Sequence, residues 1–212
     1  MNARWQDTPA AVFLRLLADL MVVNILTVLC SLGVVTMGAS LSAMYAVLFK
    51  REQEDGMVAV IRTYFQAFVR NFPKATALEL VVALVVAVAA GDFWFALNSE
   101  QPLRTLYMTV GTVIGIAALI LFVLAFPQQS IYRNSVKNYV KNSMVLAACA
   151  PGPLLLSLAA WIGPWYLAYL EQEVIIRFGV IYLLWGVAFP AWCTVKAFKK
   201  VFDRTKQEDE AT

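Results

Sequence analysis

Long apolar runs without any charge alternate with short charged segments along this chain. A helix rises about 1.5 Å per residue, so roughly 20 apolar residues cross the ~30 Å hydrocarbon core of a bilayer. The charge-free runs comprise residues 80–91, 105–132, 142–170 and 178–195. They predict an all-α fold, a polytopic integral membrane helical bundle. The four spans that are easiest to place are Lys74–Leu97, Leu103–Phe126, Met144–Leu170 and Val174–Val195.

The front of the chain is harder to divide into spans. Residues 20–49 carry no charge and would be about 45 Å long as one helix, too long for one crossing and short for two. The interruption between Gly33 and Ser40 predicts a front hairpin over residues 12–50, made of a span near Val12–Leu32, a tight bend and a short span near Ala39–Lys50. The total is then about six transmembrane helices. The alternative is one span followed by a re-entrant or interfacial helix.

Prolines and charge divide the rest of what we interpret as a single transmembrane domain, residues 1–212. Pro151, Pro153 and Pro164 predict a kink or break in the third long span, and Pro190 predicts one near the end of the fourth. The predicted parts are the front hairpin 12–50, an interfacial helix 56–72, a hairpin 74–126, a basic segment 127–143, a kinked hairpin 144–198 and a charged cytoplasmic tail 199–212.

The basic residues are distributed unevenly between alternate segments. Residues 50–74, 127–143 and 196–212 together carry 13 of the 17 lysines and arginines. The loops between the long spans carry one each, Arg104 and Arg177. By the positive-inside rule, the three basic segments and the C-terminus lie in the cytoplasm. A cell membrane is the expected location.

Several of these cations recur every fourth residue, a spacing that places them on one face of a helix. Amphipathic connecting helices on the cytoplasmic side would hold such cations near anionic lipid headgroups or against a partner protein. Ordinary topological anchoring is the alternative interpretation. The candidate docking or headgroup-binding residues are Arg62, Arg70, Arg133, Lys137, Lys141, Lys196, Lys200 and Arg204.

Polar side chains inside or beside spans are candidates for function because their burial in lipid is costly. Asp19 can pair with Arg15, four residues earlier on the same helix. Glu79 lies inside its span and is the strongest candidate for an interior acid. Asn24 is suited to a hydrogen bond between helices. Asp92, near the opposite end of the Glu79 span, is expected to be solvated or paired.

Small residues at four-residue spacing allow close approach of helices. Gly111 and Gly115 form a GxxxG motif in one span, and Gly38 and Ser42 begin a similar series in the front hairpin. Packing within one chain and homo-oligomerisation are both compatible with these residues.

Residue types that most enzymes need are missing or scattered. The chain has no histidine, and its three cysteines, Cys30, Cys149 and Cys193, lie far apart in apolar stretches. We found no phosphate-binding loop, nucleophile elbow, zinc motif or dinucleotide fingerprint. The sequence therefore predicts a non-enzymatic protein without a metal or cofactor, and its basic segments lack the context of a nucleic-acid-binding module.

Three sequence motifs carry a resemblance to a known family. They are Asn24-Ile25-Leu26, Ser31-Leu32-Gly33-Val34-Val35-Thr36-Met37-Gly38 with Ala43-Met44-Tyr45, and Phe65-Gln66-Ala67-Phe68-Val69-Arg70-Asn71-Phe72. In these motifs the chain resembles the YesL-like family of small bacterial multi-pass membrane proteins, long listed as a domain of unknown function. Gly33 stands where that family usually has proline.

The resemblance implies an accessory role, because family members look like proteins encoded beside sugar-uptake systems and carbohydrate-degrading enzymes. It brings no catalytic residues with it. We therefore expect a non-enzymatic membrane protein that assists or regulates carbohydrate uptake, with membrane lipids and components of a sugar-uptake system as partners. The alternative is a small transporter or channel with its own substrate, in which a broken helix near the bilayer midplane would face polar groups.

Overall fold

The apolar runs of the sequence fold into helices in the computed structural model, which describes residues 8–54, 58–170, 179 and 182–210. The elements are α2 (Pro9–Cys30), the short 3-10 helix η1 (Val34–Thr36), α3 (Met37–Gln53), α4 (Val60–Leu97), α5 (Leu103–Ile131), α6 (Val136–Cys149), α7 (Pro151–Leu170) and α9 (Ala188–Glu210). No strand occurs in the described residues. The predicted all-α class is confirmed.

Three of these helices, α2, α4 and α5, are long and apolar enough to cross a membrane. The pair formed by α6 and α7 counts as a fourth candidate if its bent halves make one span. The chain is thus a polytopic membrane protein. The six predicted spans are not all found in the described part, because α3 has only 17 residues, and the predicted span Val174–Val195 is interrupted at Gly186 and lies partly outside the described residues.

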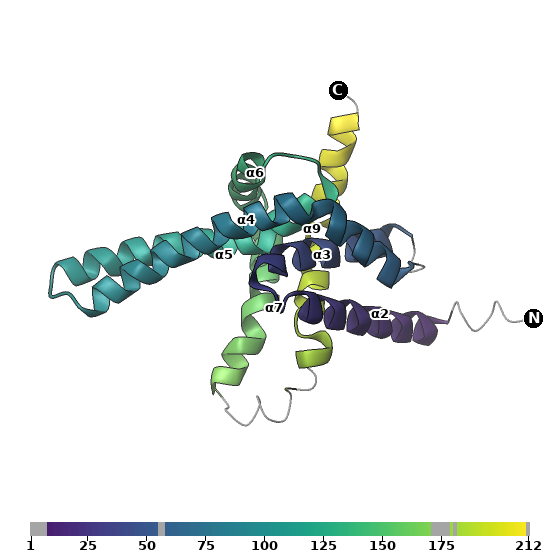
Figure 1. The fold of residues 1–212 in the computed structure, drawn as a ribbon, viewed down its shortest axis with the longest axis horizontal. Helices are drawn as coiled ribbons and strands as arrows, with labels where there is room; N and C mark the ends of the chain where they lie inside the picture. Colours follow the sequence, from purple (N-terminus) through teal and green to yellow (C-terminus); the bar gives the residue numbers. More distant parts are fainter. Residues whose placement is uncertain (1–7, 55–57, 171–178, 180–181, 211–212) are drawn as a thin grey trace, which may run out of the picture.

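Helix α4 joins two elements that the sequence analysis separated. It runs for 38 residues, about 57 Å, and contains Pro73 in its interior. The predicted interfacial helix 56–72 and the span from Lys74 are therefore one continuous helix from Val60 onward. Proline lacks the N–H of the helical ladder and bends a helix. The first part of α4 accordingly runs in a different direction from the rest (Figure 1).

The segment after α5 also differs from the prediction. Helix α5 continues through Pro127 to Ile131, so the predicted basic segment 127–143 begins inside it. Helix α6 starts after Ser135, whose hydroxyl accepts a hydrogen bond from the Asn138 N–H. It ends before Ala150, where the chain turns by 106° into α7. Pro151 follows Ala150, and the helical conformation is disfavoured for a residue that precedes proline.

A second break precedes α9. Residues 182–185 are helical, Gly186 and Val187 form a turn, and α9 starts at Ala188. The kink predicted at Pro190 is therefore displaced to Gly186. Pro190 is the third residue of α9, where an N–H has no partner within the helix in any case, so the proline is tolerated.

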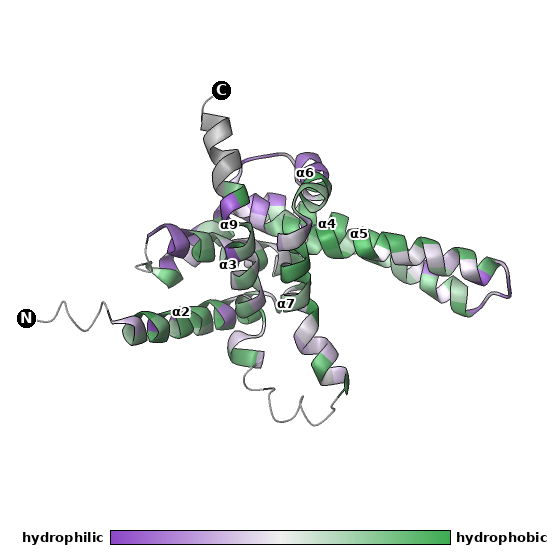
Figure 2. Cartoon of the chain, turned by 180° about the vertical axis from the view of Figure 1, so that it is seen from behind, coloured by the Kyte–Doolittle hydropathy of each residue, from purple (hydrophilic) through white to green (hydrophobic). Residues whose placement is uncertain are grey.

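Helix α3 occupies the centre of the molecule. All of its residues from Gly38 to Tyr45 are buried, and it contacts α2, α4, α5 and α9. Three apolar arms project from this centre in different directions: α2, the hairpin of α4 with α5, and α7 (Figures 1 and 2). Large apolar side chains such as Leu84, Val113 and Leu156 are exposed on the last two arms. Lipid or another protein must cover surfaces of this kind.

Candidate functional site: polar contacts around helix α3

The N-terminal end of α3 lies against α4 through Gly38 and Glu79. The Gly38 N–H donates a hydrogen bond of 2.9 Å to Oε2 of Glu79. A Cβ at position 38 would lie 2.6 Å from the Ala75 carbonyl oxygen and 2.9 Å from the Glu79 Cβ. Glycine therefore permits the close approach, and the carboxylate satisfies one of the free N–H groups of the first helical turn, where negative charge is favoured.

The C-terminal end of α3 is tied to α2 by an ion pair. Nε of Arg51 lies 2.9 Å from Oδ2 of Asp19, and the two side chains are only 8% and 19% exposed. The predicted partner of Asp19 was Arg15. The structure corrects this, because the front hairpin brings the long guanidinium side chain of a neighbouring helix to the carboxylate.

The next residue, Glu52, ties the same end of α3 to α9. Its carboxylate lies 2.8 Å from Nζ of Lys196 and 3.7 Å from Nζ of Lys199, and it is 9% exposed. The indole of Trp192 donates to its other oxygen at 3.3 Å. The sequence analysis missed Glu52, since nothing in the local pattern of a charged segment reveals which acid meets a distant helix.

Asn24 of α2 replaces a missing backbone hydrogen bond at the break before α9. Its amide Nδ2 donates to the Leu183 carbonyl at 2.6 Å, and its Oδ1 accepts from the N–H groups of Val187 and Ala188 at 2.8 Å each. In an unbroken helix the Val187 N–H would bond to the Leu183 carbonyl. The fully buried Asn24 therefore supplies both partners that the break removes.

Further buried polar groups surround α3. Asn71 of α4 donates to the hydroxyl of Ser42 at 3.1 Å, and Gln128 of α5 donates to the hydroxyl of Ser143 at 3.0 Å. Among the described residues, the hydroxyls of Tyr45 and Tyr64 are buried without a hydrogen bond of standard geometry. Buried polar groups are normally satisfied. The nearest polar side chains are Thr194 and Trp161 for Tyr45, and Ser40 and Thr27 for Tyr64.

The two glycines of the GxxxG motif have different environments. A Cβ at Gly111 would lie 3.0 Å from the Asp92 Cβ and 3.4 Å from the Ala89 carbonyl oxygen, so this glycine serves the contact between α5 and α4. Gly115 has no atom of another residue near its missing Cβ. The motif is therefore only half used within the described part of the chain.

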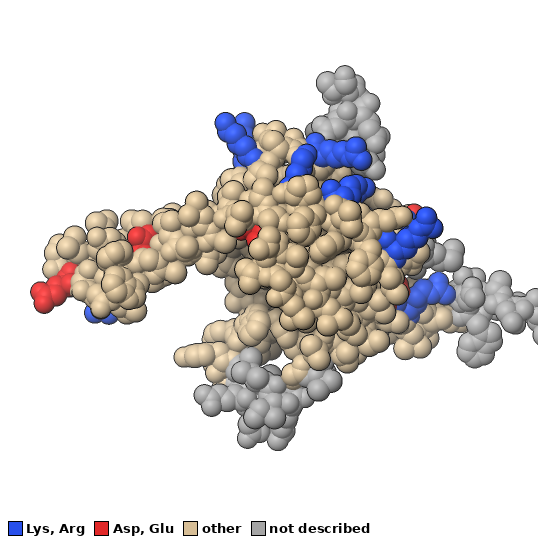
Figure 3. Space-filling model, viewed as in Figure 1, with Lys and Arg blue, Asp and Glu red and all other residues tan. Residues whose placement is uncertain are grey.

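The predicted basic residues do not form one uniform surface. Lys137 and Lys141 are exposed on α6, but Arg133 lies in the linker before that helix and cannot continue its stripe. Lys196 is held by Glu52, whereas Lys200 is exposed. Arg62 and Arg70 are exposed on α4, and the side chain of Arg204 is outside the described residues. Figure 3 shows cations on the side where α6 and α9 lie and near the start of α4.

The acids of this region all make contacts that join helices. Asp19 and Glu52 bind cations of neighbouring helices, and Glu79 binds a backbone N–H. The described residues contain no group of three or more histidine, cysteine, aspartate or glutamate side chains that could hold a metal ion. The arrangement thus has a clear capacity to fix α2, α4 and α9 around α3.

Comparison with known proteins identifies one family. Residues 20–93 match the model of a family described as "Protein of unknown function, DUF624". This segment comprises the second half of α2, all of α3 and most of α4, and so contains Asn24, Gly38, Arg51 and Glu79. The resemblance stated from the sequence motifs is confirmed in this segment. No curated protein and no solved structure matches the chain.

Proposed function

We propose that this chain, whose residues 20–93 belong to the DUF624 family of unknown function, is a non-enzymatic accessory protein of the bacterial cytoplasmic membrane that assists or regulates carbohydrate uptake. The observation that supports the non-enzymatic part is that the acids around α3 are engaged in contacts between helices. Asp19, Glu52 and Glu79 each join two helices. An acid that fixes a helix contact is not available for proton transfer without loosening that contact.

The apolar arms and the exposed cations support an accessory role. The hairpin of α4 and α5 offers exposed apolar residues along its length, which is suited to lateral contact with another membrane protein. Lys137, Lys141 and Lys200 are exposed and, with the C-terminus, lie in the cytoplasm in the proposed topology. Their charge favours an acidic partner surface, and it raises the rate of association.

Carbohydrate uptake enters this proposal through the family resemblance, and a partner search tests it. The tagged full-length protein would be cross-linked in native membranes, purified in mild detergent and analysed by quantitative mass spectrometry. We expect components of a sugar-uptake system to be enriched with the wild type. We also expect the Lys137→Glu/Lys141→Glu variant to lose them. An unchanged set of partners would remove these cations from the docking surface, and enrichment of no uptake component would refute the accessory role.

A small transporter with its own substrate is the second candidate, and one observation favours it. The break before α9 faces a buried polar side chain, Asn24, as discontinuous helices do in transporters. The break at Ala150, which the sequence analysis had singled out, is less suitable because Pro151 and Gly152 are exposed. Uptake of labelled sugars into proteoliposomes that contain only this protein would support the transporter and refute the accessory role.

A further inference from the structure

A groove separates α2 from the start of α4. It has a volume of about 560 Å³, within the range of about 300–1,000 Å³ that is typical of ligand pockets. The apolar part of its wall comes from Ala18 and Val22 of α2 and from Val58, Ile61 and Phe65 on the opposite side. Ile61 and Phe65 are themselves 58% and 46% exposed, so the groove is open along its apolar side.

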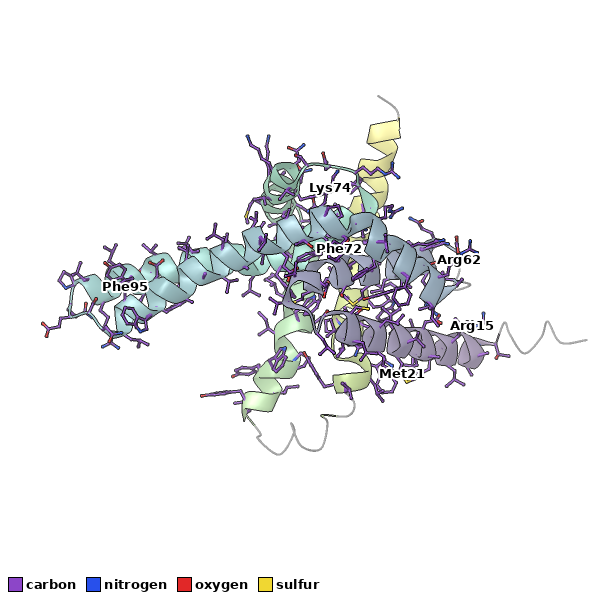
Figure 4. The ribbon with its side chains drawn as sticks, viewed as in Figure 1. Arg15, Met21, Arg62, Phe72, Lys74 and Phe95 are labelled. Atoms are coloured by element: carbon purple, nitrogen blue, oxygen red, sulfur yellow. The ribbon has the colours of Figure 1, made fainter. Side chains whose placement is uncertain are left out.

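One arginine lines this groove, and a second lies on the helix face that borders it. Arg62 lines it directly. Arg15 precedes Ala18, Asp19 and Val22 by three, four and seven residues, and therefore lies on the same face of α2 as these lining residues. Both arginines lie on the side of the molecule where the N-terminal end of α2 is found (Figure 4). The groove thus combines an apolar channel with a cationic end.

The one acid that lines the groove does not cancel this positive charge. Asp19 is held by Arg51 at 2.9 Å, so its charge is already compensated. No ion pair joins Arg15 or Arg62 to an acid among the described residues, so both can face an anion. A free phosphate would use the two cations and leave the apolar wall uncovered, whereas a phospholipid covers the wall with its acyl chains and places its phosphate at the arginines.

We propose that the groove between α2 and α4 binds an anionic phospholipid, with acyl chains along Val22, Ile61 and Phe65 and the headgroup phosphate at Arg15 and Arg62. This site does not depend on the proposed role in carbohydrate uptake. Each arginine near a membrane surface favours an anionic lipid by a factor of about five. Removal of both should weaken selective binding about 25-fold.

The site can be tested by thermal unfolding of the full-length protein in detergent, monitored by tryptophan fluorescence. The probes are phosphatidylglycerol, phosphatidylcholine and inorganic phosphate, and native mass spectrometry counts the bound lipids. We expect phosphatidylglycerol to raise the Tm of the wild type more than phosphatidylcholine does. We expect this difference to vanish in Arg15→Gln/Arg62→Gln. The matched control Lys137→Gln/Lys141→Gln also removes two cations, and it should keep the difference.

A second variant tests the apolar wall without changing any charge. Ala18→Trp fills the groove from an exposed position and should abolish the phosphatidylglycerol effect while the Tm without lipid stays near that of the wild type. Equal shifts with both lipids, or a full shift with inorganic phosphate alone, would overturn the proposal. Retention of the preference for phosphatidylglycerol in Arg15→Gln/Arg62→Gln or in Ala18→Trp would also overturn it. Loss of that preference in the control Lys137→Gln/Lys141→Gln would do the same.

Discussion

The Gly38 N–H donates a 2.9 Å hydrogen bond to the Glu79 carboxylate at the point where α3 and α4 approach each other. The sequence indicates these two residues for separate reasons, one as a small packing residue and the other as an interior acid. The structure unites them, because the glycine allows the approach and the acid satisfies the helix end that the approach buries. Their substitution therefore tests packing and electrostatics separately.

Gly38→Ala should destabilise the protein. Its Cβ would lie 2.6 Å from the Ala75 carbonyl oxygen, so α3 and α4 must separate, at a cost of about 1–3 kcal/mol for overpacking. Gly115→Ala is the matched control, since no atom lies within 4 Å of its new Cβ, and alanine is the better helix former. Unfolding in detergent with increasing SDS measures both variants. Equal stability of the two alanine variants would show that α3 and α4 do not meet at Gly38.

Glu79→Gln and Glu79→Ala should differ in stability. Glutamine keeps an acceptor for the Gly38 N–H but loses the charge at the helix N-terminus, which is worth about 0.3–1 kcal/mol. Alanine also leaves the buried N–H without a partner, at a cost of about 1–3 kcal/mol. The same SDS titration measures both. A glutamine variant that folds normally but loses its co-purifying partners would instead give Glu79 a functional role.

The Asp19–Arg51 ion pair should appear as coupling in a double-mutant cycle. Asp19→Asn and Arg51→Gln each leave a largely buried charge unpaired, so we expect a coupling free energy of about 0.5–3 kcal/mol between them. The cycle of Asp19→Asn with Arg15→Gln is the comparison and should show a coupling near zero. Coupling to Arg15 in place of Arg51 would restore the pairing inferred from sequence and contradict the structure.

The local sequence pattern was sufficient to predict the apolar helices, but it was not sufficient to predict the contacts between them. Charge-free runs located α2, α4 and α5, because the length needed to cross a bilayer is a property of each segment. The partners of Asp19, Asn24 and Glu52 were not predictable, since they lie 32 or more residues away in the sequence. The boundary predicted between the segments 56–72 and 74–126 was wrong, because α4 continues through Pro73 and has buried residues on both sides of it.

Reporter fusions test the topology. We expect fusions after Lys50, Ser135 and Thr212 to be cytoplasmic and fusions near Asn98 and Gln172 to be external; Gln172 lies outside the described residues. A reporter at Met1 should be cytoplasmic as well, because the Asp19–Arg51 pair places the N-terminal half of α2 beside the C-terminal end of α3. An external Met1 together with a cytoplasmic Lys50 would exclude the front hairpin.

Asn24→Leu should change hydrogen exchange at the break before α9 more than any substitution of similar size nearby. Leucine removes the acceptor of the Val187 and Ala188 N–H groups and the donor to the Leu183 carbonyl, and each unsatisfied buried group costs about 1–3 kcal/mol. The break then either closes into a regular helix, restoring the Val187 to Leu183 bond, or remains open with faster exchange of both amides.

Hydrogen exchange measured by mass spectrometry on peptides that include residues 182–195 distinguishes these two outcomes. Slower exchange at Val187 would mean that Asn24 holds the helix broken, as the transporter candidate requires. Faster exchange would mean that another feature sets the break and Asn24 only satisfies it. Thr27→Val is the control, because its buried hydroxyl donates within α2, to the Val23 carbonyl at 2.8 Å. Hydrogen exchange near Val187 in Thr27→Val should match the wild type. If exchange is also unchanged in Asn24→Leu, the contact of Asn24 with the Val187 and Ala188 N–H groups is refuted.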